Sequence, residues 1–176
     1  MVGSVNDALW QQHGGAIAML DNALAACPDA LWTEPLWEVS PASEWPTDAS
    51  ALWSVAAHTV RWLERNLAAA SEDEFSSLEC AEALTSKDGA PIGKSAIRAC
   101  LATVREHCHD TLMTLRDEEL YRPVTYDWIS PAPISYLELQ IYGLRHLQEH
   151  TTQLSLFLGQ KGIPDEALDW VPRAGS

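Results

Sequence analysis

The chain has 176 residues, of which 47% are hydrophobic, and a formal net charge of −14. This length and apolar content suit one buried core, so we expect residues 1–176 to form a single domain. The negative charge argues against nucleic acid and against anionic membrane surfaces as partners, because both require a basic face on the protein.

The sequence also indicates a cellular setting. It has no apolar run near the roughly 18 residues that a membrane span requires, and its first residues resemble no signal peptide. We therefore expect a cytoplasmic protein that has no membrane partner. The four cysteines show no CxxC spacing, which indicates reduced thiols; they are Cys27, Cys80, Cys100 and Cys108.

Apolar residues recur at helical spacing in four stretches, which predict helices at about residues 5–27, 50–70, 92–117 and 134–161. The second helix illustrates the pattern, because its buried face is expected to hold Leu52, Val55, Ala56, Thr59, Leu63 and Leu67. The fourth helix is expected to stop at Gly162, a residue type common just after a helix end.

The connections between these helices are long and read as irregular. Residues 29–49 carry three prolines among three tryptophans, as in segments that form a lid or pocket wall. Residues 71–91 read as a crossover or loop, and residues 118–133 as irregular. With no convincing strand period in the sequence, we predict an all-α fold: a four-helix bundle with crossover connections.

Three histidines are the candidate ligands of a metal ion. His146 and His150 lie four residues apart, so their side chains project from one helical face about 6 Å apart. His58, on the predicted second helix, would complete a set of three neutral nitrogen ligands. Spacing alone leaves two interpretations open, a metal site or a polar network in the core.

The segments around these histidines resemble a known family. They are WSVAAHTVRWLE, from Trp53 to Glu64, and HLQEHTTQLSLFLGQKGIP, from His146 to Pro164. Both are similar to the DinB/YfiT-like superfamily, in which one histidine of the second helix and a HxxxH pair of the last helix hold a divalent metal. All three positions match here, so the resemblance implies that His58, His146 and His150 are the metal ligands.

The resemblance also implies properties that composition does not show. It implies a homodimer, and it implies zinc or nickel as the metal, although iron also accepts imidazole ligands. A metal held by three neutral ligands strongly polarises a water or a small thiol at its open position. We therefore expect either a hydrolase or a thiol-dependent transferase acting on a small-molecule substrate. The alternative is a non-catalytic metal-binding or stress-linked structural protein.

Other residues have weaker claims to the site. His13, inward on the first helix, could serve as an outer-shell group or proton shuttle, but a core role is the simpler interpretation. The second ring nitrogen of each ligand needs an acceptor, for which Gln153, Glu64 or a backbone carbonyl are candidates. Aromatic residues of the connections could line a pocket or merely pack together; they are Trp32, Trp37, Trp45, Tyr126 and Trp128.

Three further polar residues near these positions are expected to have no role in the site. His107 and His109 flank Cys108, and this i, i+2 spacing places the two histidines on different faces of a helix. Glu149 follows His146 closely in the sequence but points about 100° away from the ligands, so we expect it to be solvated.

Overall fold

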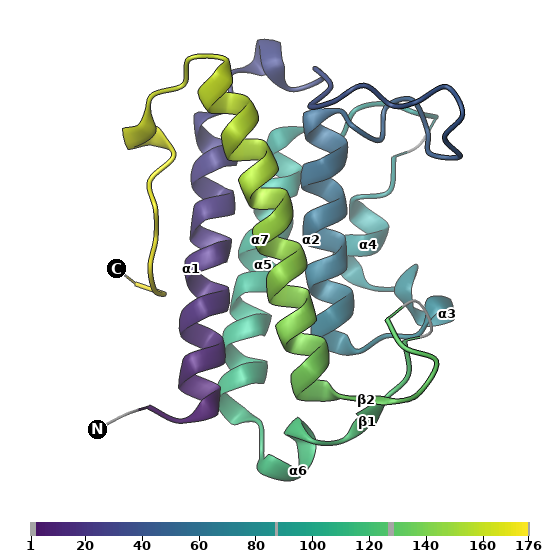
Figure 1. Ribbon diagram of the computed structural model, residues 1–176, viewed down its shortest axis with the longest axis vertical. Helices are drawn as coiled ribbons and strands as arrows, with labels where there is room; N and C mark the ends of the chain where they lie inside the picture. The colour runs from purple at the N-terminus through teal and green to yellow at the C-terminus, as the bar shows by residue number, and fades with distance from the viewer. Residues whose placement is uncertain (1–2, 87, 127–128, 176) are drawn as a thin grey trace.

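Four long helices run side by side through the structure, a computed structural model that describes residues 3–86, 88–126 and 129–175 (Figure 1). They are α1 (Val5–Ala26), α2 (Leu52–Ala68), α5 (Lys94–Thr114) and α7 (Tyr136–Gln160). Both α1 and α2 contact α5 and α7, so the contacts close into a ring. In Figure 1, α1 and α7 rise from the lower end, whereas α2 and α5 descend. The chain is mostly helical, as predicted.

Local sequence signals explain where these helices begin and end. Ser4 caps α1 by accepting a hydrogen bond from the Asp7 amide, and the Asp7 carboxylate accepts one from the Ser4 amide. Ser135 caps α7 by accepting from the Glu138 amide. Beyond the end of α7, Gly162 takes a φ of +87°, in the region that favours glycine. Both ends of α7 therefore lie close to the predicted boundaries.

The connections contain more regular structure than the sequence indicated. Their elements are η1 (Asp29–Leu31), α3 (Glu72–Phe75), α4 (Glu79–Ala83), α6 (Asp117–Leu120), β1 (Pro123–Val124), β2 (Ile134–Ser135) and η2 (Asp165–Ala167). Residues 71–91, expected to form a crossover or loop, contain the two short helices α3 and α4. The antiparallel pair β1 and β2 escaped prediction because two residues are too few to show strand alternation.

The predicted third helix was also too long. The regular helix α5 ends at Thr114, because Leu115 has an extended backbone with ψ at 133°. Arg116 is extended as well and caps α6. A break of two residues therefore separates α5 from α6, where the sequence predicted continuous helix to residue 117.

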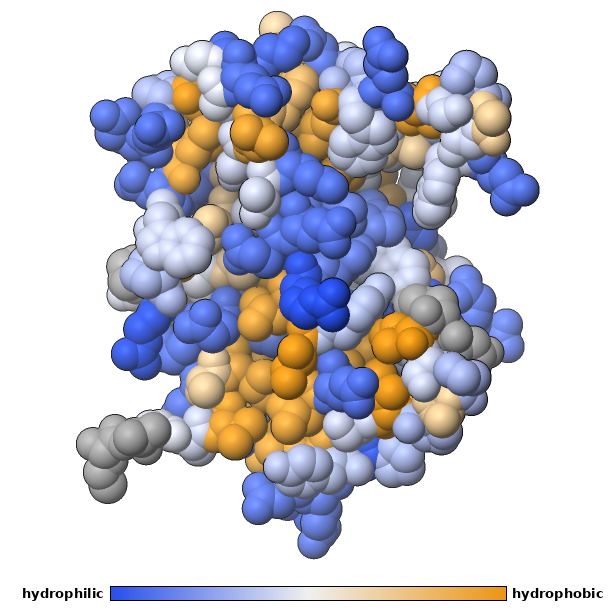
Figure 2. All heavy atoms as spheres, in the orientation of Figure 1, coloured by the Kyte–Doolittle hydropathy of each residue, from blue (hydrophilic) through white to orange (hydrophobic). Residues whose placement is uncertain are grey.

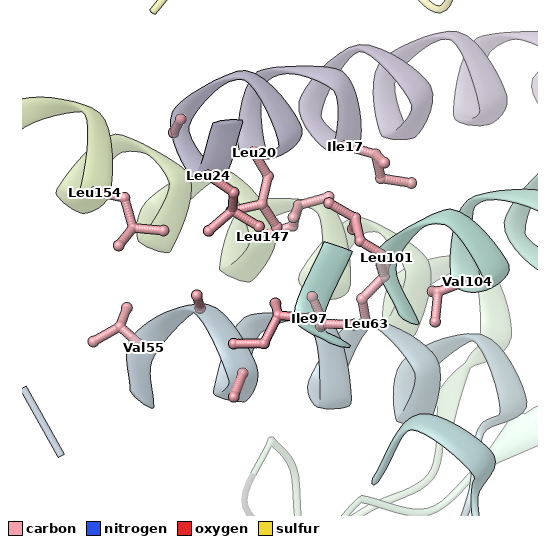
Figure 3. Packing of buried hydrophobic residues seen from close by; sticks show 14 of the residues in the cluster. Ile17, Leu20, Leu24, Val55, Leu63, Ile97, Leu101, Val104, Leu147 and Leu154 are labelled. Carbon is pink, nitrogen blue, oxygen red and sulfur yellow. The ribbon is translucent and has the colours of Figure 1, made fainter. Parts of the chain in front are cut away.

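The core lies between the four long helices. Figure 3 shows side chains from each helix meeting there, including Leu20 of α1, Leu63 of α2, Leu101 of α5 and Leu147 of α7. The six residues expected on the buried face of α2 are all buried. A second apolar cluster lies where β1 and β2 meet α7, and it consists of Val124, Tyr126, Ile134, Tyr136 and Leu139. Packing of these faces stabilises the helices more than their intrinsic propensity does.

The surface of the molecule is mixed in polarity. On the face drawn in Figure 2, apolar side chains gather around the lower part of α7, while hydrophilic ones cover its middle. Ile141 of α7 is 49% exposed. No helix in the described part of the chain is both long enough and apolar enough to cross a membrane.

Candidate metal centre

Three histidine side chains from two helices converge at one point. His58 lies on α2, and His146 and His150 lie one turn apart on α7. The Nε2 atom of His146 is 3.1 Å from Nε2 of His58 and 3.1 Å from Nε2 of His150. One nitrogen from each ring lies within 4.8 Å of the other two. The structure thus brings together the three histidines that their spacing and flanking residues singled out.

A glycine lets the two helices approach closely near this point. A Cβ atom at Gly143 of α7 would lie 3.2 Å from the side chain of Asn66 on α2, tighter than ordinary van der Waals contact. Gly143 precedes His146 by three residues, so the two share one face of α7. The missing side chain at Gly143 therefore helps His58 to reach the imidazoles of α7.

Gln153 determines which nitrogen of His150 carries hydrogen. Its Oε1 atom lies 2.8 Å from Nδ1 of His150, and an amide oxygen only accepts, so Nδ1 donates. In neutral His150, Nε2 then presents a lone pair to His146. The single Nε2 hydrogen available to a neutral His146 cannot point at both neighbouring rings. Hydrogen bonds among the three rings therefore cannot satisfy both contacts well.

Burial keeps two of the imidazoles uncharged. Burial lowers the pKa of His58 to about 3, with further contributions from His146, His150 and Arg61. Burial and then His150 lower the pKa of His146 to about 4. Both rings are therefore neutral at pH 7, which is the form in which imidazole binds metals.

Aromatic rings hold the histidines from the side. The ring centroid of Trp62 lies 5.7 Å from that of His58 and 6.0 Å from that of His146. Tyr142 stacks on His146, with ring planes 18° apart and centroids separated by 6.2 Å. These contacts restrict the orientation of the imidazoles and shield them from water.

A cavity of about 840 Å³ opens beside the histidines. His58 and His150 lie in its wall. The rest of the lining comes from residues 37–49, from α2 and from residues before α5. Its apolar members include Trp37, Trp45, Trp53 and Leu84. The connection at 29–49 therefore contributes a pocket wall, as predicted. A cavity of this size accommodates a small-molecule ligand.

The aromatic residues of the connections divide between cavity and core. Trp37 and Trp45 line the cavity. Trp32 is buried in the core, and its Nε1 donates to the Ile92 carbonyl at 2.8 Å. The buried Tyr126 hydroxyl bonds to backbone carbonyls at the end of α2. Trp128 lies outside the described residues. Lining and packing, the two alternatives left open by the sequence, therefore both occur.

His13 lies apart from the three histidines. It is fully buried in α1, and its Nδ1 is 2.9 Å from the Leu9 carbonyl, to which it donates. Its Nε2 is buried without a hydrogen-bond partner among the described residues. His13 is therefore a core residue, and none of the contacts described for it involves His58, His146 or His150.

Of the suggested acceptors for the ligand rings, Gln153 is in place and Glu64 is not. The Glu64 carboxylate accepts from the Cys80 amide at 3.1 Å and from the Ala81 amide at 2.9 Å. It therefore caps the short helix α4, where a carboxylate satisfies free amide groups. Of the three candidate acceptors named from the sequence, Glu64 is thus engaged elsewhere. Glu149, expected to be solvated, is exposed.

The cysteines of the chain offer no thiolate. All four are free, and burial raises the pKa of each thiol, that of Cys108 to about 12. Cys108 is buried, as predicted, and the flanking His107 and His109 are exposed on α5. A thiol reacting at this cavity would therefore have to come from another molecule.

Arg61 is a cavity residue that was missed from the sequence. It follows His58 by three positions on α2 and therefore lies on the same helical face. That spacing was the available signal, but an arginine at such a position is usually solvated, so the signal was weak.

Comparison with known proteins supports the family resemblance. The family model described as DinB superfamily matches residues 12–154, which include all three histidines. Searches of curated proteins and of solved structures gave no significant match.

Proposed function

Because the chain belongs to the DinB superfamily, we propose that it is a divalent-metal-dependent enzyme with His58, His146 and His150 as ligands. Zinc or nickel is the proposed metal, with iron as a third candidate, since all three accept imidazole nitrogen. The proposed reaction is hydrolysis or the transfer of a small thiol to a small-molecule substrate. The homodimer and the cytoplasmic location remain predictions, as does the four-helix bundle with crossover connections.

The spacing of the three rings fits such an ion. With metal–nitrogen distances of about 2.0–2.1 Å, neighbouring ligand nitrogens are separated by roughly 3.0–3.4 Å. The two Nε2 separations of 3.1 Å lie in this range. One Nε2 hydrogen cannot satisfy both contacts of His146. A cation among the rings would instead accept a nitrogen lone pair from each imidazole. The donor set of neutral imidazoles therefore suits a divalent metal.

The cavity beside His58 and His150 is the observation that carries the catalytic proposal. A structural metal has a closed set of protein ligands, whereas a catalytic metal keeps a position open to water or substrate. Three protein ligands next to a space of about 840 Å³ correspond to the second arrangement. When bound, the metal would supply polarisation of a water or thiol at that open position.

The chain's own residues would prepare the site for this chemistry. Gln153 orients His150 through its Nδ1, and burial keeps His58 and His146 in the neutral, ligating form. Trp62 and Tyr142 pack beside the rings. The tryptophans of the cavity provide an apolar surface for the body of a substrate.

The test is turnover by zinc-loaded protein on a small panel of electrophiles, with and without added glutathione or cysteine. We chose 4-nitrophenyl acetate for hydrolysis and 1-chloro-2,4-dinitrobenzene for thiol transfer. Turnover should disappear with EDTA and in His58→Ala, and should persist in His107→Ala, which removes an exposed imidazole. Dependence on added thiol would indicate transfer, and its absence hydrolysis.

The opposite result would favour the non-catalytic alternative. If zinc-loaded protein turns over none of these compounds, or if turnover is unaffected by EDTA and by His58→Ala, the catalytic proposal fails.

A further inference from the structure

Arg61 is a half-buried cation in the cavity wall that has no carboxylate partner among the described residues. Its Nε atom is buried, and among the described residues its guanidinium forms no hydrogen bond and no ion pair. It lies over the ring of Phe75, 5.1 Å from the centroid, which holds one face of the guanidinium. Burial lowers the pKa of Arg61. A charge that is partly removed from water in this way is commonly paired with an opposite charge.

Carboxylates are abundant in this chain, so their scarcity does not explain the unpaired arginine. The chain has 25 acidic against 11 basic residues. Arg65, one turn further along α2, pairs with Glu72 at 2.8 Å and also donates to the Ala70 carbonyl. Arg98 pairs with Asp21 at 2.7 Å. Arg61 thus differs from Arg65 and Arg98 in having no carboxylate partner among the described residues.

The position of Arg61 relates it to the histidines. Arg61 and His58 share one face of α2 and line one cavity. The Arg61 charge contributes to the lowered pKa of the His58 imidazole. A ligand bound to Arg61 would therefore occupy the cavity that the histidine cluster also lines. Among the described lining residues, Arg61 supplies the only lysine or arginine side chain.

We propose that Arg61 binds the carboxylate of a substrate that carries one negative charge on an apolar body. The guanidinium would take the carboxylate in two parallel hydrogen bonds, and Trp37, Trp45 and Trp53 would contact the apolar part. The carboxylates of Glu38 and Asp48 also line the cavity and would repel a dianion, such as a phosphate monoester, more strongly than a monoanion. This inference rests on the proposed function, since it names the substrate class of the same site.

The experiment measures binding and needs no turnover. The probes are 3-phenylpropanoate and its uncharged amide, 3-phenylpropanamide, titrated into zinc-loaded protein by calorimetry. We expect the acid to bind at least about 10-fold more tightly than the amide, because a charged hydrogen bond is replaced by a neutral one. Arg61→Gln should abolish this preference, and Arg61→Lys should retain part of it.

Arg105→Gln provides the matched control, because Arg105 is an exposed arginine of α5 that lies in another surface cavity. It should leave the preference for the acid unchanged. Thermal melts of each variant check that it is folded. The inference is overturned if wild-type protein does not bind the acid, if acid and amide bind equally, or if folded Arg61→Gln keeps the preference.

Zinc content, measured on the same samples, separates this inference from the proposed function. If wild-type protein binds no zinc but still prefers the acid through Arg61, the metal proposal fails and the carboxylate site stands. If zinc binds to the histidines but Arg61→Gln leaves acid binding unchanged, only the carboxylate site fails.

Discussion

At the scale of single residues, Gln153 controls the orientation of one proposed ligand. Its side chain accepts the Nδ1 hydrogen of His150 and so directs the Nε2 lone pair toward His146. We predict that Gln153→Ala weakens zinc binding by about 10-fold, the lower range for loss of such a supporting contact. Calorimetric titration with zinc measures this. Gln148→Ala, on the same helix, should bind zinc as wild type does, and equal affinities for all three proteins would refute the role of Gln153.

His13 makes a prediction about acid stability. Burial lowers its pKa in the folded protein below the ordinary value of 6.5, so the unfolded chain binds the proton more readily. The lowered pKa of His13 therefore has no effect on the free energy of unfolding above about pH 6.5, and it destabilises the folded protein as the pH falls below that value. For one such group, the loss of unfolding free energy reaches up to about 2 kcal/mol at pH 5.

Urea unfolding of metal-free protein at pH 7.5 and pH 5 tests this prediction. The loss of stability between these pH values should be smaller in His13→Leu than in wild type. The lowered pKa values of His58 and His146 contribute to both proteins alike, so they cancel in the comparison. Equal losses in the two proteins would show that His13 titrates normally in the folded state.

At the scale of elements, Gly15 provides space on α1 for the C-terminal segment. A Cβ atom at Gly15 would lie 2.8 Å from the Val171 carbonyl oxygen, and the neighbouring Ala174 amide donates to Gln11 of α1 at 3.0 Å. Alanine normally stabilises a helix interior relative to glycine by about 1 kcal/mol. We predict instead that Gly15→Ala displaces this segment and brings no such gain.

Hydrogen exchange measures the displacement directly, because the Ala174 amide should exchange faster in Gly15→Ala. The control is Gly159→Ala on α7, where an added Cβ would meet nothing within 4 Å. That variant should keep the protection of Ala174 and gain up to about 1 kcal/mol in stability. Unchanged protection of Ala174 in Gly15→Ala would contradict the packing described.

The long helices were predictable from the sequence because each carries its own periodic signal. The stripe from Leu52 to Leu67, for example, needed no knowledge of its partners to be recognised as a buried face. Short elements have no such periodic signal. The helix α4, for example, depends on the carboxylate of Glu64, which accepts a hydrogen bond from the Cys80 amide 16 residues further along the chain. Contacts of this kind are decided by tertiary packing and cannot be read from local spacing.

At the scale of the whole molecule, the ring order of the helices brings the site together. Contacts of α2 with α7 bring His58 to the pair of histidines on α7, although 88 positions separate His58 from His146. Helical spacing predicted the pair and made His58 a candidate third ligand, and the family resemblance then implied all three. The cavity was predictable only as far as its wall in the connection at 29–49, and Arg61 only weakly from its spacing to His58, because the positions of both depend on how the connections fold over the helices. The stacking of Tyr142 on His146 joins residues four apart on α7, so this helical spacing was a signal that the sequence analysis missed.

The content of divalent metal in purified protein tests the central claim most directly. Elemental analysis after loading with zinc and removal of the excess should give about one ion per chain for wild type. His146→Ala/His150→Ala should bind almost none, whereas His107→Ala/His109→Ala, which removes two exposed histidines of α5, should bind as wild type does. Wild-type protein without metal, or full metal content in His146→Ala/His150→Ala, would contradict the proposed metal centre.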